Sequence, residues 1–117
     1  MGTIFWIDQN TFASNLIEKV FKKRELSFYS LTAPRDFAYL VEDLKPVAIV
    51  LDGETARIHL SDLRHEIESS LVLQKTPFII INNIPELSFI QCIGELKKPL
   101  DPFAVPKLLE NILGEMS

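Results

Sequence analysis

The sequence predicts an α/β fold in which a parallel sheet lies between two layers of helices. Short apolar runs alternate with amphipathic stretches five times along the 117 residues. The apolar runs lack polar residues at alternate positions, which is typical of strands that are covered on both faces. Three of these runs end at a polar residue, namely Asp8, Asp52 or Asn82. We therefore expect one doubly wound domain that spans residues 1–117.

The first half of the chain contains three strand–helix units. Apolar runs rich in β-branched and aromatic residues predict the strands Ile4–Ile7, Leu26–Leu31 and Val47–Leu51. Apolar residues at helical spacing predict helices over residues 11–24, over residues 34–44 and over residues 60–71. Pro34 fits the first turn of the second helix, and Pro46 ends it.

The second half of the chain contains two further units. The strand Phe78–Ile81 is followed by a short, weakly helical stretch over residues 85–93. A brief fifth strand is expected over residues 94–97, and a last helix is expected to start at Asp101 and Pro102. Pro106 would remove a backbone hydrogen bond inside that helix, so its regular part is expected to begin a few residues later.

The composition excludes several classes of protein. Twelve Lys and Arg residues against sixteen Asp and Glu residues give a net charge of -4, which does not suit a nucleic-acid-binding surface. Cys92 is the only cysteine, so a disulfide scaffold is excluded. No apolar run approaches the ~20 residues that cross a bilayer, and no signal-peptide pattern opens the chain. We expect a cytoplasmic protein that binds neither nucleic acid nor membranes.

Polar residues follow the strands at one predicted edge of the sheet. Asp8, Asp52, Asn82 and Lys98 each stand at or just after the end of a different strand. In parallel sheets these carboxyl ends meet, and ligands bind there. Carboxylates suit Mg²⁺, and a lysine suits a phosphoryl group. The pattern favours a site for phosphoryl chemistry, although charged residues also end strands simply because strand ends meet water.

Four runs of residues carry a resemblance to a known family. They are Ile4–Asp8, Val47–Asp52, Thr76–Ile81 and Leu96–Pro102. Over its full length the chain resembles the receiver domains of response regulators, which share the CheY-like (flavodoxin-like) fold. The most specific feature is Lys98-Pro99, followed by a large apolar residue and a helix start.

The resemblance implies a strand order of 2-1-3-4-5 and a role for each residue at the sheet edge. Asp52 would match the aspartate that accepts a phosphoryl group from a histidine kinase. Lys98 would pair with the phosphorylated aspartate, and the Lys98–Pro99 peptide bond would be cis. Asp8 would match one of two acidic metal ligands. The implied partners are a histidine kinase or phosphotransfer protein and a downstream effector, in bacterial two-component signalling.

The chain also departs from the family pattern. Gln9 replaces the second acidic residue after the first strand, so we expect only weak Mg²⁺ binding, by Asp8, Asp52 and Glu54. Asn82 replaces the usual hydroxyl residue and would donate a hydrogen bond to a phosphoryl oxygen. Glu95 stands where an aromatic residue is common. The fourth helix is shortened.

Two interpretations stay open. In the first, the chain is an atypical receiver, or pseudo-receiver, that acts by protein–protein interaction with impaired or absent phosphorylation at Asp52. In the second, it is a conventional Mg²⁺-dependent phosphoacceptor. A haloacid-dehalogenase-like phosphatase or a flavodoxin-like cofactor binder is a remote third, so we do not expect an enzyme. We expect Asp52 at an exposed strand end, and a homodimer would follow if Phe89 and Ile90 formed an exposed apolar patch.

Overall fold

The computed structural model describes residues 1–114 and contains a five-stranded sheet with the order β2-β1-β3-β4-β5. All neighbouring strands are parallel. The strands are β1 (Ile4–Ile7), β2 (Phe28–Leu31), β3 (Ala48–Asp52), β4 (Phe78–Ile81) and β5 (Cys92–Leu96). The predicted fold class and strand order are confirmed.

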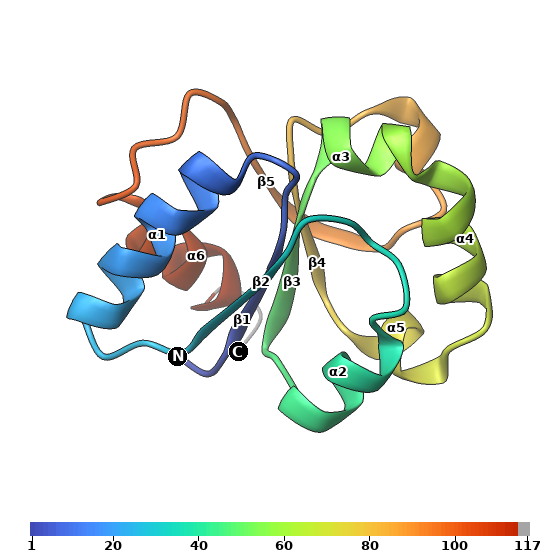
Figure 1. Ribbon diagram of the computed structural model, residues 1–117, viewed down its shortest axis with the longest axis horizontal. Helices are drawn as coiled ribbons and strands as arrows, with labels where there is room; N and C mark the ends of the chain where they lie inside the picture. Colours follow the sequence, from blue (N-terminus) through green and yellow to red (C-terminus); the bar gives the residue numbers. More distant parts are fainter. Residues whose placement is uncertain (115–117) are drawn as a thin grey trace.

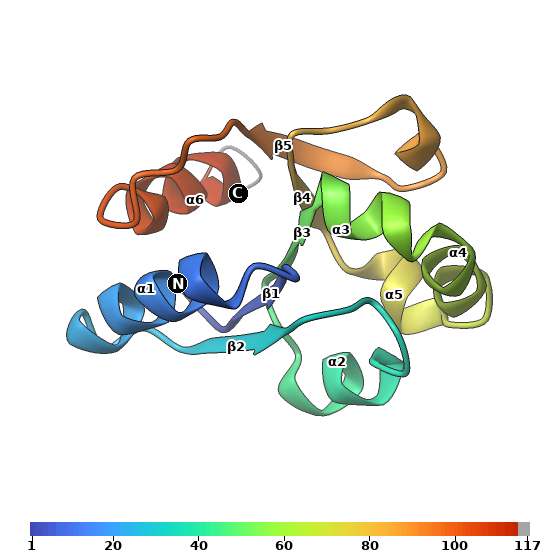
Figure 2. The same cartoon turned by 45° about the horizontal axis from the view of Figure 1, so that its top comes forward.

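Helices cover both faces of the sheet (Figure 1). One layer contains α1 (Thr11–Lys23) and α6 (Val105–Gly114). The other layer contains α2 (Ala38–Leu44), α3 (Gly53–Ile58), α4 (Leu60–Glu68) and α5 (Leu71–Lys75). Figure 2 shows the same separation from a second direction, with the sheet between the two groups. No helix within residues 1–114 is long and apolar enough to cross a membrane.

The hydrophobic core consists of two clusters, one on each face of the sheet. Successive residues of a strand point to opposite faces, so each central strand contributes to both clusters. In β1, Phe5 packs toward α2–α5 and Trp6 packs toward α1 and α6. All residues of β1, β3 and β4 are buried. This two-sided burial explains why these three strands are apolar except for Asp52, the last residue of β3.

The second helix begins later than predicted. The sequence places its start at Pro34, whereas α2 starts at Ala38. Asp36 has a φ of 50°, which is outside the helical region and interrupts the turn before it. The carboxylate of Glu66 on α4 then accepts hydrogen bonds from the N–H groups of Phe37 (2.9 Å) and Ala38 (3.4 Å). A side chain distant in sequence therefore defines where α2 begins.

The predicted third helix, over residues 60–71, corresponds to α4, and a further short helix lies on each side of it. Residues 53–58 form α3, a helix that the sequence pattern does not predict. The chain then turns at His59 into α4. A second break follows at Ser69 and Ser70, where the Ser70 hydroxyl accepts a hydrogen bond from Leu73 N–H (3.1 Å) and starts α5. The apolar spacing predicts α4 correctly, but it gives no sign of the break at His59 or of the helix start that Ser70 caps.

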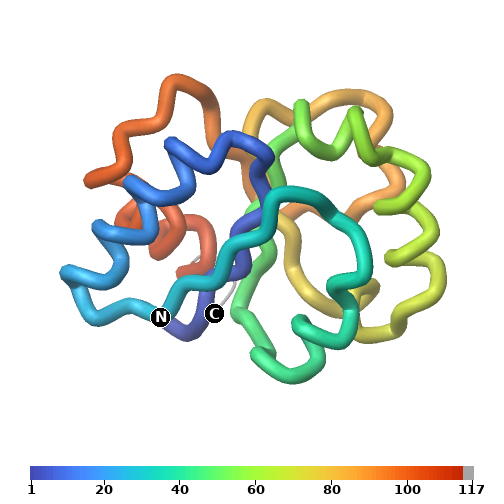
Figure 3. Tube along the Cα trace, in the orientation of Figure 1, coloured from blue at the N-terminus to red at the C-terminus, as the bar shows by residue number. Residues whose placement is uncertain are grey.

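The fourth helix is reduced to a single 3₁₀ turn over Pro85–Leu87, as the sequence indicates. Figure 3 shows the chain between β4 and β5 as an otherwise irregular path. The expected apolar patch beside this turn is wrong. Ile90 is buried in the core, and the guanidinium of Arg64 lies 4.4 Å from the centre of the half-buried Phe89 ring. The last helix begins at Val105, with Pro106 in its first turn, as predicted.

Candidate functional site

The carboxyl ends of β1, β3, β4 and β5 bring the predicted site residues together at one edge of the sheet. The Nζ atom of Lys98 lies 2.9 Å from Oδ1 of Asp52. The backbone N–H of Lys98 donates a hydrogen bond to Oδ1 of Asn82 (3.0 Å). Asp8 lies close enough to Asp52 for their charges to interact. The Lys98–Pro99 peptide bond is cis, as the resemblance implies.

Asp52 is buried, which corrects the expectation of an exposed strand end. Its side chain is 2% exposed, and it serves as the N-cap of α3. Oδ2 accepts one hydrogen bond from the Thr55 N–H (3.0 Å) and a second from the Thr55 hydroxyl (2.8 Å). The last residue of the central strand is thus also the first residue of a helix turn.

The second oxygen of Asp52 contacts Lys98. Oδ1 is buried, and no N–H or O–H group within residues 1–114 donates a well-aligned hydrogen bond to it. The contact with Asp52 raises the pKa of the Lys98 ammonium above its ordinary value, while partial burial opposes the increase. The Lys98 side chain remains 40% exposed, so the outer side of the ammonium faces solvent.

Thr55 joins the ends of two strands. Its side chain is fully buried, and its hydroxyl donates to Asp52 while accepting a hydrogen bond from the backbone N–H of Gln9 (2.9 Å). The β1–α1 connection is thereby fixed to the start of α3. Sequence reasoning missed Thr55. The signal that could have found it is the aspartate at a strand end, followed directly by a helix with threonine at its third position.

Gly53 allows α3 to start against the end of β4. A Cβ atom at this position would collide with the backbone oxygen of Asn82 and would lie 2.9 Å from that of Ile81. Only glycine permits this approach of the two backbones. The close packing places the first turn of α3, and with it the Thr55 donors, directly beside Asp52.

Asp8 is the second buried carboxylate of the site. Its Oδ1 accepts a hydrogen bond from the Asn10 N–H (2.9 Å), and Asn10 in turn caps α1. Burial raises the pKa of the Asp8 carboxyl, and the charge of Asp52 adds to the increase, whereas the Asn10 hydrogen bond opposes it. The indole nitrogen of Trp6 lies near the same carboxyl but outside hydrogen-bonding geometry.

The predicted metal ligands do not gather into one cluster. Glu54 lies on the exposed side of α3, where its carboxylate pairs with Arg57 at 3.6 Å. Both lone pairs of Asp52 Oδ2 receive hydrogen bonds from Thr55, and Gln9 supplies no acid. Within the described residues no three His, Cys, Asp or Glu side chains form a group that could hold a metal ion. The site thus offers a cation the carboxylates of Asp8 and Asp52 without a third acid, and weak Mg²⁺ binding stays a prediction.

Asn82 and Glu95 stand where the resemblance to receiver domains implies a hydroxyl residue and an aromatic residue. Asn82 has a φ of 51°, and its side-chain oxygen accepts a hydrogen bond from the backbone N–H of Lys98. Glu95 pairs with Lys97 at 2.8 Å and accepts a hydrogen bond from Asn83 N–H (3.0 Å). These two contacts lower the pKa of Glu95. Both side chains therefore hold the ends of β4 and β5, and the phosphoryl contact of Asn82 stays a prediction.

An apolar groove of about 580 Å³ opens beside Asp8 and Lys98, between α1 and the segment that follows β5. Phe12 and Leu16 form its α1 wall, and Leu100 lies opposite. The Phe12 side chain is 75% exposed.

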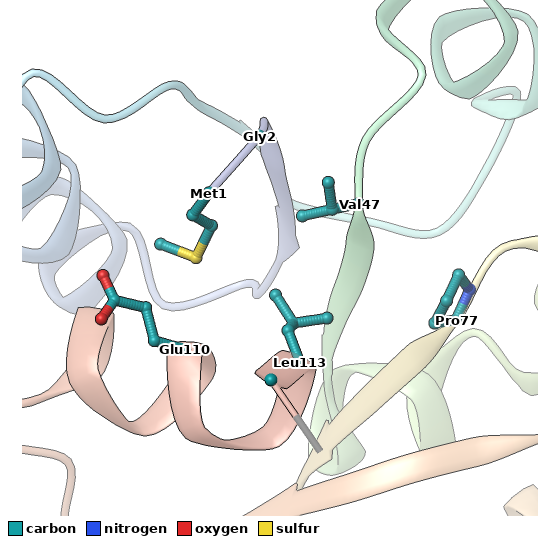
Figure 4. Close-up of a pocket in the computed structure, with 7 residues that line it drawn as sticks. Met1, Gly2, Val47, Pro77, Glu110 and Leu113 are labelled. Carbon is teal, nitrogen blue, oxygen red and sulfur yellow. The ribbon is translucent and has the colours of Figure 1, made fainter. Parts of the chain in front are cut away.

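A second cavity of about 440 Å³ lies at the opposite edge of the sheet, at the amino ends of the strands (Figure 4). Its walls are mainly apolar, and among the described residues that line it Glu110 is the one with a charged side chain. The lining residues are Met1, Gly2, Val47, Pro77, Glu110, Leu113 and Gly114. The polar residues that the sequence singles out all lie at the other edge.

Comparisons with known proteins identify the fold. No family model matches the sequence, and no curated protein is similar to it. The structure is similar to a response regulator from Desulfuromonas acetoxidans, with a TM-score of 0.79, 12% identity and coverage of 100% of both chains. It is also similar to the chemotaxis response regulator CheY4 of Vibrio cholerae, with a TM-score of 0.75 and 14% identity over 96% of this chain and 98% of that one.

A third similar structure is the signal receiver domain of a Luxo repressor protein from Vibrio parahaemolyticus. Its TM-score is 0.69 at 15% identity, over 97% of this chain and 91% of that chain. The chain therefore has the fold of response-regulator receiver domains.

Proposed function

We propose that this chain is an atypical receiver domain in a cytoplasmic, bacterial two-component or phosphorelay system. It acts by binding other proteins, and phosphorylation of Asp52 is impaired or absent. The domain performs no enzymatic reaction of its own. The shared fold and the placement of Asp52 beside Lys98 support a receiver origin.

The observation that carries the proposal is the enclosure of Asp52. A phosphoacceptor must present a carboxylate oxygen to an incoming phosphorus atom. Here the side chain is 2% exposed, Thr55 supplies two donors to Oδ2, and Lys98 covers Oδ1. Gln9 in place of an acid and the position of Glu54 also reduce the negative charge available to hold Mg²⁺.

The groove beside the site supports the protein-binding part of the proposal. Phe12 and Leu16 present an apolar surface on α1, and Phe103 is 69% exposed in the segment between β5 and α6. Isolated exposed apolar residues are common, but a large ring at the rim of a groove supplies area that a partner can bury. A phosphotransfer protein, a histidine kinase or an effector would be the partner.

The conventional phosphoacceptor is the second candidate, and one observation favours it. The 2.9 Å contact between Lys98 and Asp52 places a cation where a phosphoryl group on Asp52 would need one. In that case Lys98 would neutralise the charge that develops on the phosphoryl oxygens. The two candidates differ in whether partner binding depends on phosphorylation.

The test compares partner binding by three forms of the protein. Wild type, Asp52→Asn and Phe12→Ser are immobilised, and proteins retained from a lysate of the source organism are identified. The proposal predicts a partner that wild type and Asp52→Asn retain equally and that Phe12→Ser loses. Leu71→Ser is the matched control, because Leu71 is 71% exposed on α5 in the other helix layer. A partner retained only after treatment with acetyl phosphate would contradict the proposal.

A further inference from the structure

We propose that Thr55 is the positioning residue that keeps Asp52 closed to phosphoryl donors. The inference deepens the proposed function and rests on it. It names the group responsible for the impaired phosphorylation and assigns this role to one hydroxyl.

The Thr55 hydroxyl occupies the acceptor capacity of Asp52 Oδ2. A carboxylate oxygen has two in-plane lone pairs, and Oδ2 receives two hydrogen bonds, at 3.0 and 2.8 Å. An oxygen that accepts two hydrogen bonds has less electron density to offer a phosphorus atom. The backbone N–H belongs to the helix and is present whatever residue stands at position 55. The hydroxyl is the part of this arrangement that the side chain supplies.

Thr55 cannot move aside at low cost. Its side chain is fully buried, and its oxygen also accepts the hydrogen bond from Gln9 N–H. Gly53 holds the first turn of α3 against the backbone at the end of β4. Rotation of the Thr55 side chain away from Asp52 would therefore break both hydrogen bonds of its hydroxyl, the one to Asp52 and the one from Gln9.

The reaction that the hydroxyl opposes is a simple displacement. Because Lys98 Nζ contacts Oδ1, the attack falls to Oδ2 of Asp52, which bonds to the phosphorus of an acyl phosphate such as acetyl phosphate. The bond between phosphorus and the acetyl oxygen breaks, and acetate leaves with the electron pair. No proton is transferred. In wild type the attacking oxygen would first have to give up its hydrogen bond from the Thr55 hydroxyl.

The test measures labelling of Asp52 in variants at position 55. Wild type, Thr55→Val, Thr55→Ala and Thr55→Ser are incubated with acetyl phosphate, with and without Mg²⁺, and phosphorylation is followed by intact-protein mass spectrometry. Thr55→Val removes the hydroxyl and keeps the volume. Thr55→Ala removes the same hydroxyl without placing a methyl group against the carboxylate. Asp52→Asn, alone and combined with Thr55→Val, identifies labelling at other residues.

We expect Thr55→Val and Thr55→Ala to be labelled about tenfold faster than wild type, which corresponds to about 1.4 kcal/mol. Thr55→Ser restores the hydroxyl and should return to the wild-type rate. The Gln9 N–H donates a hydrogen bond to the Thr55 hydroxyl, so its hydrogen exchange measures whether that hydroxyl is in place. The Gln9 amide should lose protection from exchange in Thr55→Val and Thr55→Ala and regain it in Thr55→Ser.

Equal labelling rates in wild type and in folded Thr55→Val and Thr55→Ala would overturn the role of Thr55, even if wild type is labelled slowly and the proposed function stands. Unfolding of both variants would assign Thr55 to stability alone and would also reject the inference. Rapid labelling of wild type itself at Asp52 would instead contradict the proposed function.

Discussion

At the scale of single residues, the site depends on the contacts that the Asp52 carboxylate makes with Thr55 and Lys98. Asp52 ends the fully buried central strand β3 and also caps α3, so its hydrogen bonds stabilise the fold. A buried carboxylate needs such partners, because an unpaired charge away from water is costly. Thr55 and Lys98 supply them here. Thr55 and Lys98 therefore stabilise the buried charge of Asp52, and the same two residues limit the access of a phosphoryl donor to its carboxylate.

The first prediction concerns Gly53, where space for a side chain is absent. Gly53→Ala should lower the free energy of unfolding by about 2–4 kcal/mol, because its Cβ atom would force the backbones of α3 and β4 apart. Denaturant titration measures the change. Gly114→Ala is the control, because a Cβ atom there meets nothing within 4 Å, and a change within about 0.5 kcal/mol is expected. Equal effects of the two substitutions would contradict the packing described for Gly53.

The second prediction follows from the raised pKa of Asp8. A carboxyl whose pKa is higher in the folded chain than in the unfolded chain destabilises the fold when it ionises. At pH 7 this cost is present in full, and it disappears as the pH falls toward and below the ordinary pKa of 3.8. Asp8→Asn keeps an oxygen for the Asn10 N–H and removes the charge. It should therefore be more stable than wild type at pH 7.

The stability difference between Asp8→Asn and wild type should shrink as the pH is lowered toward 3.8. Thermal or denaturant unfolding of both proteins over this pH range, without added divalent cations, measures it. A variant that is less stable than wild type at pH 7 would show that the Asp8 charge stabilises the fold. The opposing contributions of Asn10 and Lys98 would then outweigh burial.

At the scale of secondary-structure elements, side chains that lie outside a helix decide where it begins. The N-terminus of α2 receives its cap from Glu66 on α4, and α3 receives its cap from the end of β3. These caps satisfy N–H groups that lack a partner within their own helices. The helix layer beside α3 is therefore built from several short helices that depend on one another.

The third prediction tests the cap of α2. Glu66→Ala should lower the free energy of unfolding by about 1–2 kcal/mol, because two N–H groups lose a charged acceptor. Glu66→Gln keeps an acceptor and should lose less. Glu68→Ala is the matched control on the same helix, because Glu68 is exposed. An effect of Glu66→Ala no larger than that of the control would mean that α2 starts at Ala38 for another reason.

Strands β1, β3 and β4 could be predicted because burial on both faces leaves almost only apolar residues in them, and the strand order could be predicted from the resemblance to receiver domains. The meeting of Asp8, Asp52 and Lys98 follows from the same topology, since parallel strands end at one edge. The start of α2 could not be predicted, because its cap lies 29 residues away in Glu66. The enclosure of Asp52 was also missed, because it depends on the approach of α3 to β4 at Gly53.

At the scale of the whole molecule, the two edges of the sheet differ in character. The carboxyl edge carries the buried carboxylates, Lys98 and the groove along α1. The amino edge carries a mainly apolar cavity next to the first residues of the chain (Figure 4). A partner that binds the groove would lie beside Lys98, which lines it and is 40% exposed.

The fourth prediction concerns the central claim, that this receiver fold holds its aspartate closed. The most direct test is an NMR titration of the ¹⁵N-labelled protein with Mg²⁺ and then with beryllofluoride, which mimics an acyl phosphate, with Asp52→Asn as the control. We predict no saturable shifts of the Gln9, Thr55 and Lys98 amides at millimolar concentrations. Saturable shifts of these amides that vanish in Asp52→Asn would contradict the account and would identify a working phosphoreceiver.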